Sequence, residues 1–115
     1  MLFMKFNVFS QNDSLNYYSK IFKDTGVVCI GERTIAFNYI SKKITENKTS
    51  IKFLKKYLNI ETVTKNEDNS KEYSYVLDCN CFYNEKRERK ITSCEFVRII
   101  VFKRKIIKIE YYGIP

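Results

Sequence analysis

Hydrophobic residues recur at two different spacings along this chain, and the spacing changes near its middle. In the first half they recur every three or four residues, which is the period of an amphipathic helix. Leu15, Tyr18 and Phe22 follow this spacing. They predict a helix that begins with a cap at Asn12 or Asp13 and ends before the first glycine.

A single glycine, Gly31, separates a short predicted strand over residues 27–30 from a second helix predicted over residues 32–47. The helical period places its core positions at Ile35, at Tyr39 or Ile40, and at Ile44, and its solvent positions at Arg33, Lys42 and Lys43. A third, short helix is predicted to follow a cap at Thr49 or Ser50. Its apolar side carries Ile51, Leu54 and Leu58.

From Ile60 onward, apolar residues alternate with polar ones, which is the two-residue period of a strand. The predicted strands cover residues 60–64, 73–83, 91–102 and 106–112. Charged segments separate the last three strands, so these strands are predicted to be consecutive antiparallel neighbours. The whole chain, residues 1–115, is therefore predicted to form one α+β domain, with N-terminal helices packed on an antiparallel sheet.

The composition is that of a folded domain, and the charge indicates a class of partner. The 115 residues are 44% hydrophobic and carry a formal net charge of +8. Most of the positive residues are lysines, which favour a diffuse positive field over the bidentate contacts that arginine makes. Such a charge predicts an acidic partner, which could be nucleic acid, protein or lipid.

The sequence also predicts a cellular compartment. The opening apolar run is short and is interrupted by Lys5 and Asn7, so no secretory signal is predicted. No stretch approaches the roughly 20 uncharged apolar residues of a membrane span. Four cysteines are few for a disulfide scaffold, and we expect reduced thiols in an intracellular protein, cytoplasmic or nuclear, that does not associate with membranes. These cysteines are Cys29, Cys79, Cys81 and Cys94.

A glycine between a strand and a helix raises the question of a phosphate-binding loop. Such loops use several glycines so that successive backbone amides converge on the anion. Gly31 stands alone, and the neighbouring Glu32 would repel a phosphate. The sequence therefore favours a turn at Gly31 over a phosphate site.

Candidate catalytic and metal-binding residues are few. The chain has no histidine, which removes the commonest general base. Asp78 is the best remaining candidate for a catalytic acid or base, because it lies on a predicted strand. A solvated surface charge is nevertheless a more frequent role for such an aspartate than an acid in a pocket. Cys79 and Cys81 lie two residues apart on one strand, so their thiols would point in parallel instead of converging on a metal. We predict that the protein is not an enzyme and uses no metal or other cofactor.

Basic residues gather on the third predicted helix and in the last predicted turn. The candidate basic surface consists of Lys52, Lys55, Lys56, Lys103, Arg104 and Lys105. A protein that binds single-stranded nucleic acid would interleave such residues with exposed aromatic side chains. A core position is favoured for the strand aromatics, and the chain contains no recognised nucleic-acid motif.

Three segments of the chain resemble the nuclear transport factor 2-like superfamily. They are "LNYYSKIFKD" with Tyr17 and Tyr18, "IGERTIAFNYI" with Gly31 and Ile35, and the terminal run "EFVRIIVFKRKIIKIEYYG". The resemblance implies a cone-like fold, in which a curved antiparallel sheet wraps a helix and its open face pairs with a second protein. It also implies an adapter that forms a heterodimer, as in messenger-RNA export. The chain departs from the family in having room for only one short strand where an extra helix and a hairpin are usual.

The predicted function is therefore protein–protein interaction through the sheet, as a homo- or heterodimer. The strand over residues 91–102 is apolar on both sides, which predicts that a second chain or the curvature of the sheet covers its second side. The predicted interface residues are Val97, Ile99 and Val101. A charged residue at Val97 or Ile99 is expected to abolish association and leave the monomer folded, whereas neutralising residues 103–105 should mainly slow association.

The alternative is a small basic nucleic-acid-binding or effector-inhibiting protein of microbial or viral origin. The two functions differ in their response to salt. Phosphate contacts make affinity fall steeply as ionic strength rises, whereas pairing of apolar sheet faces should respond little.

Overall fold

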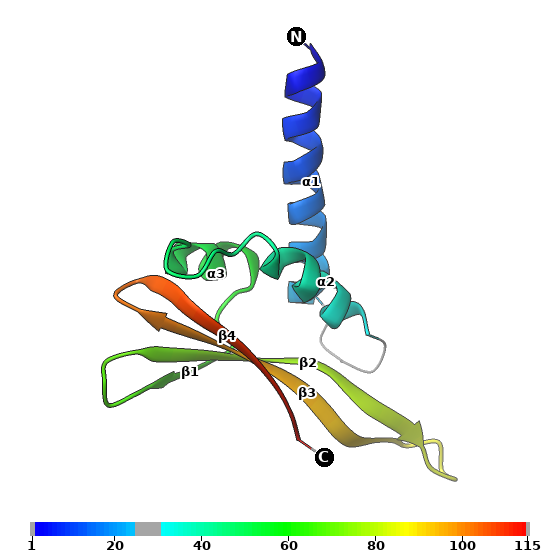
Figure 1. The fold of residues 1–115 in the computed structure, drawn as a ribbon. Helices are drawn as coiled ribbons and strands as arrows, with labels where there is room; N and C mark the ends of the chain where they lie inside the picture. Colours follow the sequence, from blue (N-terminus) through cyan, green and yellow to red (C-terminus); the bar gives the residue numbers. More distant parts are fainter. Residues whose placement is uncertain (1, 25–30, 115) are drawn as a thin grey trace.

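The computed structural model describes residues 2–24 and 31–114, which form three helices followed by a four-stranded antiparallel sheet (Figure 1). The helices are α1 (Leu2–Asp24), α2 (Glu32–Ser41) and α3 (Ile51–Tyr57). The strands are β1 (Thr62–Lys65), β2 (Lys71–Tyr83), β3 (Arg89–Phe102) and β4 (Lys105–Ile114). The sheet order is β1-β2-β3-β4. The predicted α+β class and the three consecutive antiparallel strands are thus confirmed, and the strand predicted over residues 27–30 lies outside the described residues.

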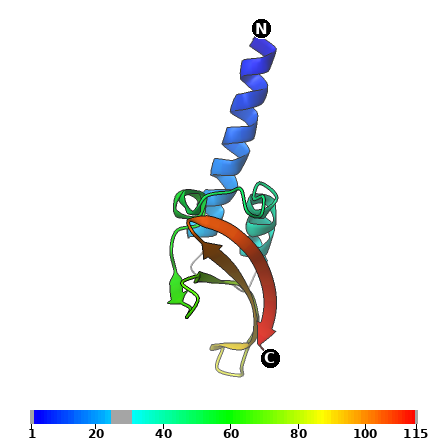
Figure 2. The ribbon, with the colours of Figure 1, turned by 60° about the vertical axis from the view of Figure 1, so that its left-hand side comes forward.

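Helix α1 is longer than predicted, because it begins at Leu2 and not at Asn12 or Asp13. No proline or glycine interrupts residues 2–24, so nothing in the sequence stops the helix from extending to the N-terminal side of Asp13. Its C-terminal part packs against the other helices, where Phe22 is fully buried and the Ser19 hydroxyl donates a hydrogen bond to the Tyr57 carbonyl at 2.8 Å. Its N-terminal part extends away from the rest of the molecule (Figures 1 and 2).

Helix α2 ends at Ser41, earlier than predicted, and its buried side is rotated from the predicted one. Ile35 was expected in the core but is 62% exposed, and Arg33 was expected in water but is only 5% exposed. The buried residues are Arg33, Ala36, Phe37 and Ile40. Tertiary hydrogen bonds explain the difference, because they satisfy the Arg33 guanidinium and allow a charged side chain to occupy a position that periodicity assigns to an apolar one.

Helix α3 agrees with the prediction in position and orientation. Ser50 is its N-cap, and the Ser50 side chain accepts a hydrogen bond from the Lys52 amide. Leu54 and Leu58 are fully buried, whereas Lys52 is exposed. In the part of the chain that the structure describes, no helix combines the length and hydropathy that a membrane span requires.

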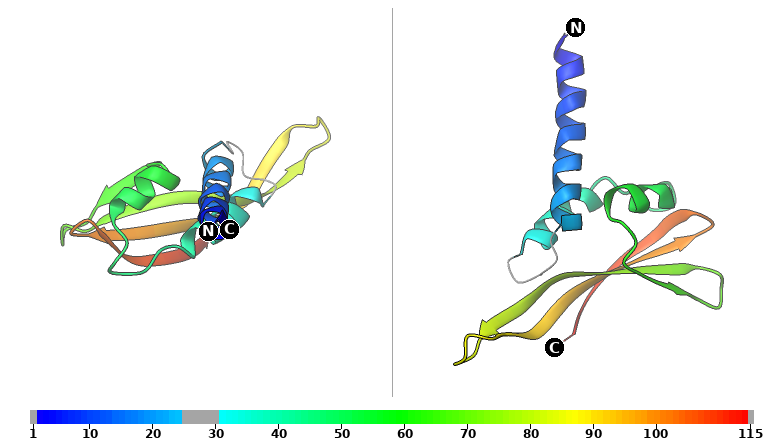
Figure 3. Two further views of the ribbon diagram at one scale, coloured as in Figure 1. Left: turned by 90° about the horizontal axis from the view of Figure 1, so that it is seen from above. Right: turned by 180° about the vertical axis from the view of Figure 1, so that it is seen from behind.

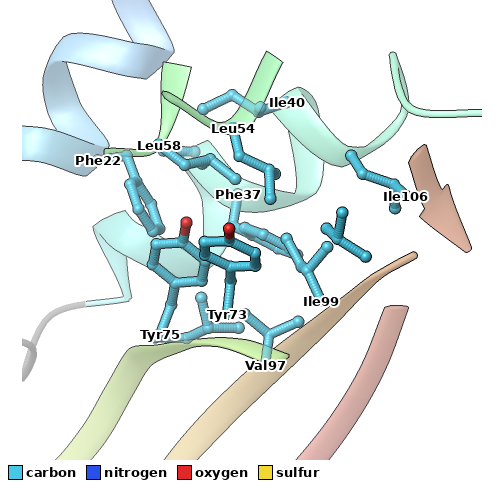
Figure 4. Packing of buried hydrophobic residues seen from close by; sticks show 13 residues of the cluster. Phe22, Phe37, Ile40, Leu54, Leu58, Tyr73, Tyr75, Val97, Ile99 and Ile106 are labelled. Carbon is cyan, nitrogen blue, oxygen red and sulfur yellow. The ribbon is translucent and has the colours of Figure 1, made fainter. Parts of the chain in front are cut away.

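The three helices lie over one face of the sheet, and their apolar residues form a single core with the strands (Figures 1 and 4). The helices contribute Phe22, Phe37, Ile40, Leu54 and Leu58, and the strands contribute Tyr73, Tyr75, Leu77, Val97, Ile99, Val101 and Ile106. The Tyr75 ring packs edge-on against Phe22, and its hydroxyl donates a hydrogen bond to the Asn59 carbonyl at 2.6 Å. Burial raises the pKa of Tyr75 above its usual range, so this hydroxyl acts as a neutral donor inside the core.

Candidate functional site

The three predicted interface residues lie in the core of the single chain. Val97 and Ile99 are fully buried and Val101 is 5% exposed, all within the cluster that the helices cover (Figure 4). This burial explains their apolar character without a second chain. A partner could reach them only if the helices separated from the sheet.

The opposite face of the sheet, which we call the outer face, is the accessible one. Within the described residues, none of the three helices covers it (Figure 2). The cross-strand register, together with alternation against the buried positions, shows which residues point to this face. They include Thr62, Thr64, Glu72, Ser74, Val76, Phe96, Arg98, Ile100, Phe102, Lys108, Glu110 and Tyr112.

An aromatic pair and an arginine form the centre of the outer face. The Phe96 and Tyr112 rings stack with centroids 5.3 Å apart and an interplanar angle of 13°. The Arg98 guanidinium lies 5.0 Å from the centroid of the Tyr112 ring. Phe96 and Tyr112 are only half-buried, so part of each ring is available for contact. Aromatic residues and arginine are enriched in protein interfaces and among the residues that contribute most to binding.

Carboxylates on the neighbouring strands hold Arg98 in place. Its Nη2 lies 2.8 Å from Glu110 Oε2, and its Nη1 lies 3.7 Å from Glu72 Oε2. Lys108 Nζ lies 2.8 Å from the other Glu110 oxygen. The hydrogen bonds from Lys108 and Arg98 lower the pKa of Glu110, and the bond to Glu110 raises the pKa of Arg98. The arginine is therefore charged and held close to the aromatic pair by its ion pairs.

The structure brings the two predicted basic clusters to one end of the molecule. The Ile51 amide at the start of α3 donates to the Arg104 carbonyl in the β3–β4 turn at 2.9 Å, and Lys105 Nζ donates to the Lys48 carbonyl at 3.1 Å. Lys52, Lys55, Lys56, Lys103, Arg104 and Lys105 are all exposed. Figure 3 shows α3 and the β3–β4 turn at this end, opposite the turn between β2 and β3. Sequence reasoning missed Lys71, which joins the cluster only because β1 and β2 turn at the same end.

Asp78 has a structural role that neither prediction for it included. Its Oδ1 accepts a hydrogen bond from the Gly31 amide at 2.9 Å, and its Oδ2 accepts from the Thr34 amide at 3.1 Å and from the Thr34 hydroxyl. A strand carboxylate therefore caps the N-terminus of α2. Gly31 has a φ of 80°, which favours glycine. The prediction of a turn at Gly31 is confirmed, and the amides that a phosphate loop would offer are already bound to Asp78.

The cysteines differ from the prediction. Cys79 and Cys94 are cross-strand neighbours in β2 and β3 and form a disulfide, and Cys81 is also disulfide-bonded. The predicted reduced state is therefore wrong for these three residues, while Cys29 lies outside the described residues. Sequence reasoning missed the Cys79–Cys94 bond because it depends on the register that places the two side chains opposite each other.

Among residues 2–24 and 31–114, no three Cys, Asp or Glu side chains are arranged to hold a metal ion.

No protein-family model matches the chain, and neither the curated proteins nor the solved structures contain a match to it. The resemblance to the nuclear transport factor 2-like superfamily therefore stays a prediction.

Proposed function

We propose that the protein is a non-enzymatic protein-interaction module that forms a dimer through the outer face of its sheet. The observation that carries this proposal is the uncovered Phe96–Tyr112 pair beside the immobilised Arg98. An antiparallel sheet with one face packed on helices usually exposes polar side chains on its other face. Here the other face also carries polar side chains, but Phe96 and Tyr112 lie together at its centre beside Arg98, and aromatic residues with arginine are typical of an interface centre.

The charge of the outer face supports pairing with a second copy of the chain. The whole chain carries a formal net charge of +8, so two copies repel each other over most of their surfaces. On the outer face, two cations and two carboxylates are linked by ion pairs: Arg98, Lys108, Glu72 and Glu110. These charges cancel, so two outer faces can approach without the repulsion that the rest of the surface would cause.

Pairing through an open sheet face also agrees with what the resemblance to the nuclear transport factor 2-like superfamily implies. In that arrangement the sheet forms the wall of a cone, with the helices inside the curve and the partner outside. A messenger-RNA export adapter would work in a reducing compartment, where disulfides are rare. The Cys79–Cys94 bond therefore favours the dimer part of that prediction over the export part.

Sedimentation velocity at increasing protein concentration tests the dimer. We expect a shift from monomer to dimer in the native protein, and a dimer dissociation constant at least about tenfold higher for Phe96→Lys, because a central aromatic contact is lost and a charge is added. The matched control is Ile35→Lys, which places the same charge at a 62% exposed apolar position on α2. It should leave dimerisation unchanged.

Circular dichroism must show that both variants are folded. A native protein that stays monomeric at near-millimolar concentration would contradict the proposal, as would a dimer that Phe96→Lys leaves intact.

A further inference from the structure

A hollow of about 210 Å³ lies at the end of the molecule where α3, the β1–β2 turn and the β3–β4 turn meet. Its polar lining comes from Lys55, Asn69, Lys71, Lys103 and Arg104, and no acidic residue lines it. Four cations from three separate parts of the chain therefore surround one small space. The outer face does not contribute to this hollow.

Within the described residues, these four cations have no ion-pair partner. Of the carboxylates in and beside the β1–β2 turn, Glu72 lies beside Arg98 on the outer face, and Asp68 accepts hydrogen bonds from the Ser70 amide and hydroxyl. Those bonds lower the pKa of Asp68, so this carboxylate is ionised and already bonded within its own turn. Glu67 is exposed and does not line the hollow. Uncompensated like charges around a shared space repel one another and create a positive potential that an anion would neutralise.

The backbone of the β3–β4 turn gives independent support. Lys103 and Arg104 are the two central residues of a two-residue hairpin, with φ of 50° and 66°. Such a turn requires positive φ at both positions and strongly prefers Asn-Gly. Lysine and arginine are unfavourable at these two positions, because side chains with a Cβ atom strain a backbone with positive φ. Strained backbone of this kind clusters at binding sites.

We infer that this hollow binds a phosphate monoester dianion, the chemistry shared by small soluble phosphate esters and by the headgroup of phosphatidic acid. Three lysines and an arginine provide ammonium and guanidinium donors, and the Asn69 amide adds a neutral donor. The hollow is smaller than the roughly 300 Å³ at which pockets for larger ligands begin, so it suits a single anionic group. Tyr73, the aromatic residue in the lining, is only 4% exposed, so it offers no surface for the base stacking that single-stranded nucleic acid uses.

The test compares two double variants with the same change of residue types and charge. Lys103→Asn with Arg104→Gly removes two cations from the hollow and gives the turn its preferred residues. The control, Lys86→Asn with Arg87→Gly, alters the β2–β3 turn at the other end of the sheet, where Arg87 also has a positive φ of 60°. Both variants leave Phe96, Arg98 and Tyr112 in place, so the dimer proposed above is tested separately.

The probes are inorganic phosphate, glycerol phosphate, phosphatidylcholine vesicles with and without phosphatidic acid, and a short single-stranded oligonucleotide. Binding is followed by amide chemical shifts of residues 71, 103 and 104 and by calorimetry. We expect the native protein and the control to bind a phosphate monoester, and the hollow variant to bind it at least about tenfold more weakly, because two charge-assisted contacts are lost. The melting temperature of the hollow variant should be unchanged or raised, which separates lost binding from lost folding.

Each outcome decides the inference. Binding of glycerol phosphate supports a soluble ester as the source, and binding only to vesicles that contain phosphatidic acid supports a lipid headgroup. Equal weakening by both variants, absence of binding to every monoester, or binding of the oligonucleotide alone would overturn the inference, the last of these in favour of a nucleic-acid function.

Discussion

The two faces of β3 have similar apolar content and opposite environments. Val97 and Ile99 on one face are fully buried under the helices, whereas Phe96 and Ile100 on the other are only half-buried. Alternation along a strand assigns residues to two faces and does not say which face meets the helices. Apolar content alone is therefore weak evidence for an interface, and the face left uncovered is the one to test.

The two arginines at the sheet extend this comparison. Arg33 is buried, and its guanidinium bonds to the Phe22 carbonyl at 3.1 Å, to the Val76 carbonyl at 2.7 Å and to the Glu61 carboxylate. Arg98 is 35% exposed and bonds to carboxylates on the outer face. The first joins three elements of the core, and the second is oriented at the surface, so equal substitutions should have unequal effects on stability.

The largest expected difference is between aspartates at adjacent positions of β3. Ile99→Asp removes a fully buried aliphatic side chain and introduces an unpaired carboxylate, which should cost at least about 4 kcal/mol and unfold much or all of the protein. This replaces the sequence-based expectation that such a variant stays folded. Ile100→Asp, on the outer face opposite Lys108, should stay folded and lose roughly 1–2 kcal/mol. Urea denaturation followed by circular dichroism measures both, and equal losses would show that the two faces are equally buried.

A smaller difference in stability is expected between substitutions of the two arginines. Arg33→Met leaves the Phe22 and Val76 carbonyls without their donor and Glu61 without its partner, so the free energy of unfolding should fall by about 3 kcal/mol. Arg98→Met removes partly exposed ion pairs that solvent screens, so it should lower the denaturant midpoint much less than Arg33→Met does. Denaturant midpoints at neutral pH measure both effects, and a larger loss for Arg98→Met would show that Arg98 and not Arg33 stabilises the core.

The smallest effect concerns pH. The folded-state pKa of Glu110 lies below its usual value of 4.5, so ionised Glu110 stabilises the fold above that value, and the contribution is lost as pH falls through the lowered pKa. The native protein should be more stable than Glu110→Gln at neutral pH, and the difference should shrink by about pH 3. Urea midpoints at both pH values measure this difference, and one that does not change with pH would contradict the assigned ion pairs.

Some elements of the fold could be predicted from local sequence patterns, and others could not. The cap at Ser50 and the buried Leu54 and Leu58 of α3 followed from short-range signals, as did the antiparallel order of β2, β3 and β4. The buried side of α2 did not, because Arg33 enters the core only where the Phe22 and Val76 carbonyls come within reach of it. The start of α1 was misplaced because a favourable capping residue, Asp13, also fits the interior of a helix.

The candidate sites, too, could be predicted from the sequence only in part. The sequence shows that Phe96, Arg98 and Ile100 share one side of a strand, and that lysines gather in two segments. It does not show that the helices cover the other side, or that α3 and two turns enclose one basic hollow. It also cannot pair Cys79 with Cys94, because the register at the bulged part of β2 and β3 determines which side chains meet.

By itself, the sequence determined the periods of the helices and strands, the single antiparallel sheet and the excess positive charge, because each depends on neighbours within a few residues. Only the tertiary structure decided which face of the sheet is buried, where Arg33 and Asp78 find their partners, and which basic residues come together. These outcomes depend on how elements far apart in the chain pack against each other, and that packing is set by the fit of the whole core and not by any local pattern.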